Sequence, residues 1–267
     1  MVNIDVEHFS GKYSIDKLID VMRALRAPDG CPWDREQDHH SIRNNFLEEV
    51  YEAVDAIDRE NVADMREELG DVLMQVIFHS IMEEEKSTFD FSDVVNDVCA
   101  KLIYRHPHVF GDVKAETSEK VLDNWDKLKR IEKSQETYAD TLTSVPEAFP
   151  ALIRAQKVQK RASKAGYDFS NAKQAFDKIR EETEEINAVI DSDNKDVVTD
   201  EIGDLLFSVV NTARLLGVDA EEALQRSTKK FINRFTAAEN DIRRDGKDIK
   251  KLNADELDVY WQKAKNK

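Results

Sequence analysis

The sequence predicts an all-α fold that is built from two copies of one helical unit. The chain of 267 residues contains only 8 Gly and 5 Pro, so turns are scarce, which favours long helices over a many-stranded sheet. Apolar residues recur at helical spacing along the chain, and no alternation typical of a strand lasts more than a few residues. The second half also repeats the pattern of the first half.

In the first half of the chain, the spacing of apolar residues predicts five helices. The first begins at the N-cap Ser14 and ends near Arg26. A loop over residues 27–40 follows, because Pro28, Gly30 and Pro32 interrupt helical structure. The remaining helices are expected over about 41–57, 62–84, 91–105 and 125–131.

The repeat becomes clear when the chain is shifted by 133 residues, which places Glu49 on Glu182. Residues 45–76 then align with 178–209 without a gap, and every acidic residue of the repeated motif stays in phase. Such a long period indicates a duplicated domain rather than a solenoid. We therefore expect one helical unit at 1–133, a polar linker at 134–144 and a second such unit at 145–267.

Each copy carries the pattern EExxE followed by ExxD. In the first copy, Glu49 and Glu52 share one helix face, as do Glu68 and Asp71, because each pair is spaced i, i+3. A polar turn separates the two helices, so an antiparallel hairpin would place the two pairs at similar heights. The equivalent residues of the second copy are Glu182, Glu185, Glu201 and Asp204.

Two interpretations of these acidic residues are open: a solvated acidic face, or a cation site. The second is favoured because Glu49 lies within an apolar stripe that points to the partner helix, and because the pattern occurs twice. Facing carboxylates need a counter-charge to stay ionised. Oxygen ligands alone suit Mg²⁺ or Mn²⁺. A di-iron bundle would require Glu-x-x-His, and neither hairpin has His at that position.

A phosphate ligand beside such an ion needs basic residues nearby. In the second unit Lys178 precedes the motif by one helical turn, Lys229, Lys230 and Arg234 form a basic strip, and Trp261 lies near the end of the chain. The first unit has a similar series, Lys101, Arg105 and Trp125. Taken singly, each is typical of a surface charge or a core aromatic. Their recurrence in both units favours contacts with a phosphate and a base.

Composition argues against several other partners. The formal net charge of −16 disfavours nucleic acid and anionic membranes, which bind basic surfaces. No apolar run approaches the ~20 residues of a membrane helix, and the first ten residues do not have the pattern of a signal peptide. The cysteines, Cys31 and Cys99, form no CxxC pattern and are typical of reduced thiols. A cytoplasmic location is therefore expected.

The motifs together resemble the MazG family of nucleoside triphosphate pyrophosphohydrolases, in the all-α NTP pyrophosphatase superfamily. The resemblance extends over essentially the whole chain and includes the duplication. Its first-half motifs are GCPWDREQ at 30–37, LEEVYEAVDAI at 47–57 and EELGDVLMQVIFH at 67–79. Its second-half motifs are AQKVQKRASKAGYDF at 155–169, REETEEINAVI at 180–190, DEIGDLLFSVVNTARLLG at 200–217, KFINRF at 230–235 and YWQKAK at 260–265.

The resemblance implies that each unit is of the four-helix type and that the protein is a homodimer. It also implies conversion of NTPs and dNTPs to the monophosphate and pyrophosphate with Mg²⁺, with broad base specificity. It also implies that the C-terminal unit is catalytic, and that Glu182, Glu185, Glu201 and Asp204 hold the metal. The set Glu49, Glu52, Glu68 and Asp71 would be a second and possibly inactive one. The implied nucleotide contacts are Lys178, Ile179, Arg180, Glu181, Glu182, Val197, Val198, Thr199, Asp200, Asp204, Lys230, Phe231, Ile232, Asn233, Arg234 and Trp261.

For the reaction, Glu181 or Glu182 would orient or deprotonate the attacking water. Lys178, Lys230 and Arg234 would offset the charge of the triphosphate, and Trp261 would stack on or wall the base. Dimerisation is also expected from the apolar run Leu205, Leu206, Phe207, Val209 and Val210. Two other functions stay open: a regulatory protein that senses a nucleotide or metal without turnover, and a structural helical dimer with solvated acidic residues.

Overall fold

The computed structural model describes residues 12–113 and 117–265. Contacts divide the chain into two compact units that meet between Lys129 and Arg130. Throughout the described residues every regular element is a helix, so the predicted all-α class is confirmed. Within that part of the chain, no helix combines the length and the apolar character needed to cross a membrane.

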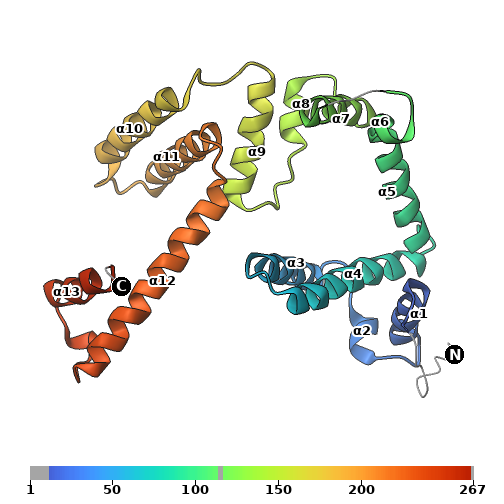
Figure 1. The fold of residues 1–267 in the computed structure, drawn as a ribbon, viewed down its shortest axis with the longest axis horizontal. Helices are drawn as coiled ribbons and strands as arrows, with labels where there is room; N and C mark the ends of the chain where they lie inside the picture. The colour runs from blue at the N-terminus through green and yellow to red at the C-terminus, as the bar shows by residue number, and fades with distance from the viewer. Residues whose placement is uncertain (1–11, 114–116, 266–267) are drawn as a thin grey trace. The chain divides into compact units, whose positions relative to one another are not determined.

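The first unit contains seven helices in the part of the chain that is described (Figure 1). They are α1 (Ile15–Arg26), α2 (Pro32–Glu36), α3 (Arg43–Asp58), α4 (Val62–Glu84), α5 (Phe91–Arg105), α6 (Pro107–Phe110) and α7 (Ser118–Glu132), the last of which extends past the division between the units. The helices expected over 62–84 and 91–105 agree with α4 and α5. The helix expected over 125–131 is the second half of the longer α7.

One sequence expectation for this unit is wrong. Residues 27–40 were expected to form a loop throughout, but Pro32–Glu36 form the short helix α2. Pro32 occupies the first turn, where its fixed φ fits a helix and its missing N–H is not needed. The prolines and the glycine therefore interrupt helical structure as expected, but Pro32 also starts a helix.

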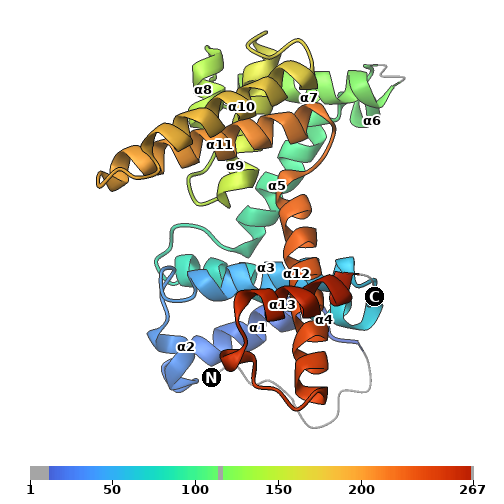
Figure 2. The same cartoon turned by 90° about the vertical axis from the view of Figure 1, so that its left-hand side faces the viewer.

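The second unit comprises α8 (Tyr138–Thr143), α9 (Ala151–Lys164), α10 (Ala172–Val189), α11 (Lys195–Leu215), α12 (Ala220–Arg244), a short 3₁₀ helix at Ile249–Lys251 and α13 (Ala254–Lys265). Figure 2 shows α10 and α11 side by side, with α13 folded back along the far part of α12. Helix α9 packs against α11 and α12. Thus the unit consists of a hairpin supported by α9 and a separate α12–α13 pair.

The two helix hairpins, α3–α4 and α10–α11, are the repeated part of the fold. In both, an Asn at the equivalent position caps the second helix. The Asn61 side-chain oxygen accepts from the backbone N–H of Ala63 and Asp64, and that of Asn194 accepts from Asp196. Such a cap satisfies amide groups that the helix cannot pair internally. The cap therefore fixes where the second helix starts, and with it the register of the acidic residues.

Buried side chains hold each unit together. In the first unit, Met22 and Ile42 pack with Ile77, Phe78, Ile81 and Met82 of α4. In the second, Ile242 packs with Tyr260 and Ala264 between α12 and α13. Two glutamines fasten α9: Gln159 donates to the carbonyl of Phe207, and Gln156 bonds the backbone of Val218 and Ala220. These bonds set the turn between α11 and α12.

Candidate metal and nucleotide site

The α10–α11 hairpin brings three carboxylates together, from Glu182, Glu201 and Asp204. One oxygen of each lies within 4.8 Å of the others. Glu182 is 3% exposed, whereas Glu201 is half-buried and Asp204 is exposed. Hard divalent cations bind such oxygens at 2.0–2.6 Å, so small side-chain adjustments would let all three reach one ion. We call these residues the second cluster.

Glu185 does not join that group at the same spacing. Its carboxyl instead shares a hydrogen bond with that of Glu182. The hydrogen bond with Glu182, together with burial and the Glu182 charge, raises the pKa of Glu185. The structure therefore places three of the four residues implied as metal ligands around one point, and the fourth beside them.

Lys178 supplies the counter-charge of the second cluster. Its Nζ atom lies 2.7 Å from Glu181 Oε1 and 2.8 Å from Glu182 Oε1. The Lys178 hydrogen bond lowers the pKa of Glu182 despite its burial, and the same pair of bonds raises the pKa of Lys178. Glu182 Oε2 is buried. When Glu185 is ionised and so cannot donate, no donor among the described groups reaches this oxygen. An oxygen atom in that state is suited to a cation.

The α3–α4 hairpin forms an equivalent first cluster from Glu49, Glu68 and Asp71, again with oxygens within 4.8 Å. Its chemistry differs, because the position equivalent to Lys178 is Asn45. Burial, and then the neighbouring charges of Asp71 and Glu52, raise the pKa of Glu49. Burial, and then the Glu52 charge, raise the pKa of Glu68. The first cluster thus has no cation of its own at the Lys178 position.

The other implied nucleotide contacts fall into two groups. Ile179 and Arg180 follow Lys178 on α10, and residues 197–200 form the early turns of α11, just before Glu201. These are close to the second cluster along the chain. Lys230–Arg234 lie instead midway along α12. Trp261 lies on α13, which in both ribbon views is beside the end of α12 remote from α10 and α11 (Figures 1 and 2).

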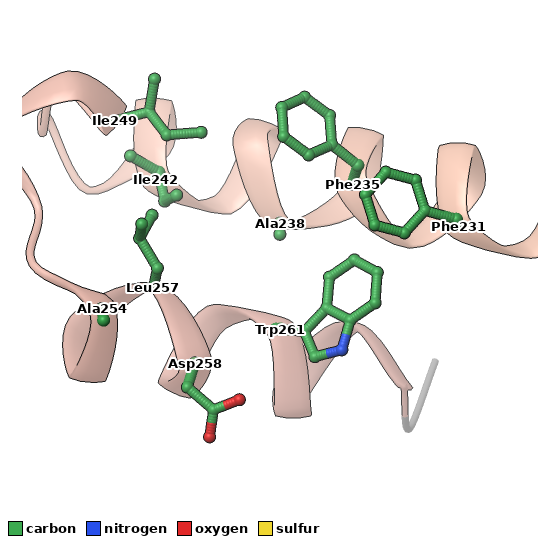
Figure 3. A pocket seen from close by; sticks show the side chains of 9 residues that line it. All are labelled: Phe231, Phe235, Ala238, Ile242, Ile249, Ala254, Leu257, Asp258 and Trp261. Atoms are coloured by element: carbon green, nitrogen blue, oxygen red, sulfur yellow. The ribbon is translucent and has the colours of Figure 1, made fainter. Parts of the chain in front are cut away.

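Trp261 lines an apolar groove of about 410 Å³ between α12 and α13. Its ring lies 5.2 Å from that of Phe231, at an angle of 48°. Figure 3 shows both rings at one end of the groove, with Asp258 as its acidic side chain. The remaining lining residues are Phe235, Ala238, Ile242, Ile249, Ala254 and Leu257.

Sequence reasoning missed two features of the acidic clusters and one of the groove. It did not foresee that Lys178 would bind both Glu181 and Glu182, although the i, i+3 and i, i+4 spacings were visible. It also overlooked Asn45, whose alignment with Lys178 was the signal that the two clusters differ in charge. In the groove, Phe235 was not singled out, although it follows Phe231 by one helical turn.

Comparison with known proteins identifies one family in both units. The pattern of the MazG nucleotide pyrophosphohydrolase domain matches residues 37–110 and 171–237, one segment in each unit. The chain belongs to the MazG family. Each matched segment contains one of the two hairpins, so the duplication inferred from the acidic motifs coincides with two MazG segments.

Three relatives support the same membership, and two of them are matched over at least 95% of their length. A nucleoside triphosphate pyrophosphohydrolase of Escherichia coli K12 is 42% identical over 257 residues, which cover 94% of this MazG chain and 97% of the relative. A protein of Thermotoga maritima named nucleoside triphosphate pyrophosphohydrolase/pyrophosphatase MazG is 40% identical, over 94% of this chain and 95% of its own. A pyrophosphohydrolase of Mycobacterium tuberculosis is 32% identical over 249 residues.

The Lys178 interaction makes a prediction about pH. A depressed carboxyl pKa stabilises the fold above the ordinary Glu value of about 4.5, and this contribution is lost as the pH falls below it. Lys178→Gln would leave a buried carboxylate without its cation, so we expect a melting temperature lower by a few degrees at pH 7. In the variant, burial without the Lys178 bond raises the pKa of Glu182, so Glu182 takes up a proton as the pH falls. The difference in melting temperature should therefore shrink toward about pH 5. Thermal melts without divalent cations, from pH 7 to pH 5, measure this.

Lys173→Gln is the matched control, because Lys173 is an exposed lysine on the same helix. It should melt like the unmodified protein at each pH. Equal melting of the Lys178→Gln variant and the unmodified protein at pH 7 would contradict a stabilising role for the Lys178 interaction.

Proposed function

We propose that this MazG protein hydrolyses nucleoside triphosphates between the α and β phosphates, giving the monophosphate and pyrophosphate. The observation that carries the proposal is the second cluster, in which three carboxylates and a lysine converge on one hairpin. The names of its relatives point to the same reaction. We further propose that NTPs and dNTPs are both substrates and that the second unit is the catalytic one.

The donor set fits Mg²⁺, with Mn²⁺ as a substitute. All candidate ligands are carboxylate oxygens, and Glu182 Oε2 is a buried oxygen that lacks a donor. Glu182, Glu201 and Asp204 would hold the ion, and Glu185 would join them on losing its proton. When bound, the ion would supply Lewis-acid stabilisation of the negative charge that develops on the leaving pyrophosphate.

The residues of the chain would act on the water and the phosphates. Glu181 is exposed, and only its Oε1 is bonded to Lys178. Its other oxygen would accept a proton from water, a role that Glu182 could share. The water oxygen would bond to the α phosphorus as the bond from that phosphorus to the α–β bridging oxygen breaks. The bridging oxygen leaves with pyrophosphate, and the water proton passes to the carboxylate.

Residues 178–182 and 197–200 and Asp204 would contact the nucleotide from α10 and α11, and the α12–α13 pair would provide the other contacts. Lys230 and Arg234 would offset the triphosphate charge. Phe231 and Trp261 present aromatic rings beside an apolar groove. Stacking on aromatic rings tolerates every base, because each base has a π face. This property supports a broad base specificity.

We propose that the protein acts as a homodimer. On α11, Leu206, Phe207 and Val209 are between 43% and 49% exposed, so this face of the hairpin is not covered within the chain. Val210, which was expected on the same face, is instead buried in the core. Exposed apolar residues continue along α10–α11 at Ile190, Val197 and Ile202. A second copy of the chain would cover such a surface.

The reaction is tested by product analysis. Incubation of the intact chain with a dNTP and Mg²⁺ should yield the monophosphate and pyrophosphate in equal amounts. Chelation with EDTA should abolish turnover, and excess Mg²⁺ or Mn²⁺ should restore it, because the proposed ligands are all oxygens. Release of single phosphate would indicate a phosphatase, and binding of the nucleotide without turnover would favour a regulatory sensor.

The active unit is tested by a matched pair of variants. Glu201→Gln keeps the size of the side chain and removes one charge from the second cluster. Loss of one such interaction in the transition state costs on the order of 3–4 kcal/mol, so pyrophosphate release should fall by roughly 10²–10³-fold. Glu68→Gln, the equivalent change in the first cluster, should have a much smaller effect.

Thermal melts of both variants provide the control for folding, since relief of like-charge repulsion should leave the fold intact. Equal losses of activity would mean that both units are catalytic. A loss with Glu68→Gln alone would overturn the assignment of the active unit.

The dimer is tested by light scattering. At micromolar concentration the protein should have twice the mass of one chain. Leu206→Asp places a charge in the exposed apolar face of α11 and should shift the protein toward the monomer. Leu122→Asp is the control, because Leu122 is an exposed leucine on α7. A monomeric unmodified protein, or equal behaviour of the two variants, would count against this interface.

A further inference from the structure

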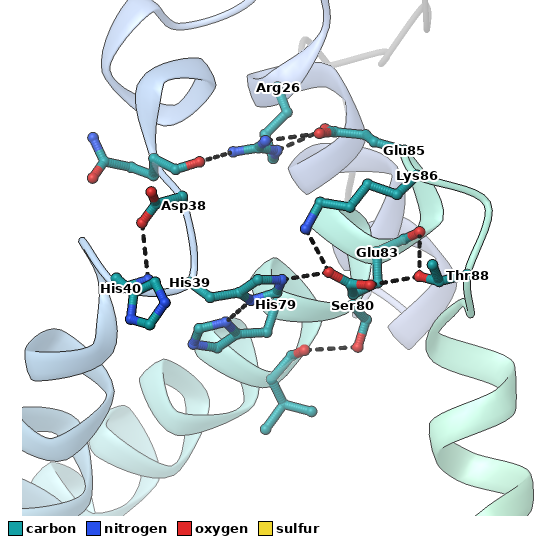
Figure 4. Close-up of polar contacts among 12 residues, drawn as sticks. Arg26, Asp38, His39, His40, His79, Ser80, Glu83, Glu85, Lys86 and Thr88 are labelled. Atoms are coloured by element: carbon teal, nitrogen blue, oxygen red, sulfur yellow. Dashed lines mark hydrogen bonds and ion pairs between the residues drawn. The ribbon is translucent and has the colours of Figure 1, made fainter.

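A pair of histidines joins two segments of the first unit that are 40 residues apart. His39 belongs to the connection between α2 and α3, and His79 lies on α4. Their Nδ1 atoms are 2.7 Å apart, and the two rings are nearly parallel, at 8°. Figure 4 shows this direct bond, with His39 between His79 and Glu83. The pair lies outside both acidic clusters and has no part in the proposed reaction.

Glu83 fixes the protonation of the pair. His39 Nε2 lies 2.6 Å from Glu83 Oε1, and Glu83 also accepts from Lys86 Nζ and Thr88 Oγ1 at 2.6 and 2.5 Å. The bonds from Lys86, Thr88 and His39 lower the pKa of Glu83 to about 2. Because Glu83 is thus an acceptor, His39 carries its proton on Nε2. His39 Nδ1 is then an acceptor, and His79 donates from Nδ1.

The pair can take up one proton but not two. A first proton on His79 Nε2 lets the Nδ1 proton pass to His39, so a single N–H remains between the rings. A second proton would set two N–H groups against each other at 2.7 Å and break the bond. Burial, and then the neighbouring His39, lower the pKa of His79. The bonded pair therefore resists full protonation.

The other contacts of this region do not depend on a group that titrates near neutrality. Arg26 of α1 donates to the carbonyls of Asp34 and Gln37 and forms an ion pair with Glu85. The Asp38 carboxylate accepts from the backbone N–H of His40 and Ser41 within the connection. From α3, the neighbour of His79 is the uncharged ring of Phe46.

The second unit has no such bridge in its described residues. The position equivalent to His79 is Thr212, whose hydroxyl donates back to the carbonyl of Ser208 on its own helix. The histidine pair is thus a property of the first unit alone, and it goes beyond the function proposed for the second.

We propose that His39 and His79 form a proton-operated latch, which fastens the α2–α3 connection to α4 at neutral pH and releases it in acid. The direction follows from linkage. A histidine whose folded pKa lies below its unfolded value of about 6.5 stabilises the closed form above that pH. The contribution is lost as the pH falls below about 6.5, so the α2–α3 connection loses its bond to α4, while Arg26 still holds the carbonyls of Asp34 and Gln37.

The experiment is amide hydrogen exchange on the full chain at pH 7.5 and pH 5.5, read as protection factors to remove the intrinsic effect of pH. Protection of residues 37–42 should fall in acid, by up to about tenfold for each pH unit below 6.5. His79→Gln and His39→Gln retain hydrogen-bonding groups but cannot become charged, so their protection should lose this pH dependence. Unchanged protection of the unmodified protein, or unchanged pH dependence in both variants, would overturn the proposal.

His40→Gln is the matched control. His40 belongs to the same connection and is exposed, and the contact that Figure 4 draws for it runs through its backbone N–H. This variant should respond to pH like the unmodified protein. If the other variants fail to fold, side-chain NMR of the unmodified protein still decides. It should show His39 protonated at Nε2 and His79 at Nδ1 at pH 7.5, and the opposite tautomers would refute the latch.

Discussion

In both units of this MazG chain, carboxylates face each other across a helix hairpin. Their mutual repulsion is the constraint on which the rest of the structure depends. Each unit brings three of them within 4.8 Å, on helices whose register is fixed by an Asn cap. Such a group is unfavourable unless a positive charge or a proton compensates it. The group that provides this compensation differs between the two clusters. It decides which chemistry each cluster can support.

The two units compensate the same acidic pattern in different ways. In the second, Lys178 reaches both Glu181 and Glu182, so Glu182 is held ionised although it is buried. In the first, Asn45 takes the place of that lysine, and the pKa values of Glu49 and Glu68 rise. An ionised cluster of carboxylates can hold a cation. The duplication thus preserved the geometry of the hairpin while the electrostatics of the copies diverged.

The divergence extends beyond the clusters. The first unit places a histidine pair along α4, where the second has Thr212 bonded to its own helix. The second unit has the aromatic groove of Phe231 and Trp261. In the first, the rings of Trp125 are covered by the cations of Arg105 and Lys129. One tryptophan therefore lines an apolar groove, whereas the other is engaged by charged side chains.

The sequence by itself determined the long helices of the first unit, the cap at Ser14 and the pairing of acidic residues on one face, because these depend on spacing within a few residues. The repeat at 133 residues also fixed which residues of the two units correspond. Only the tertiary structure decided that Glu185 pairs with Glu182 outside the group of three, that Pro32 starts a helix, and that Val210 is buried. It alone joined His39 to His79, since a contact across 40 residues depends on how α4 packs and on side-chain rotamers, neither of which local spacing specifies.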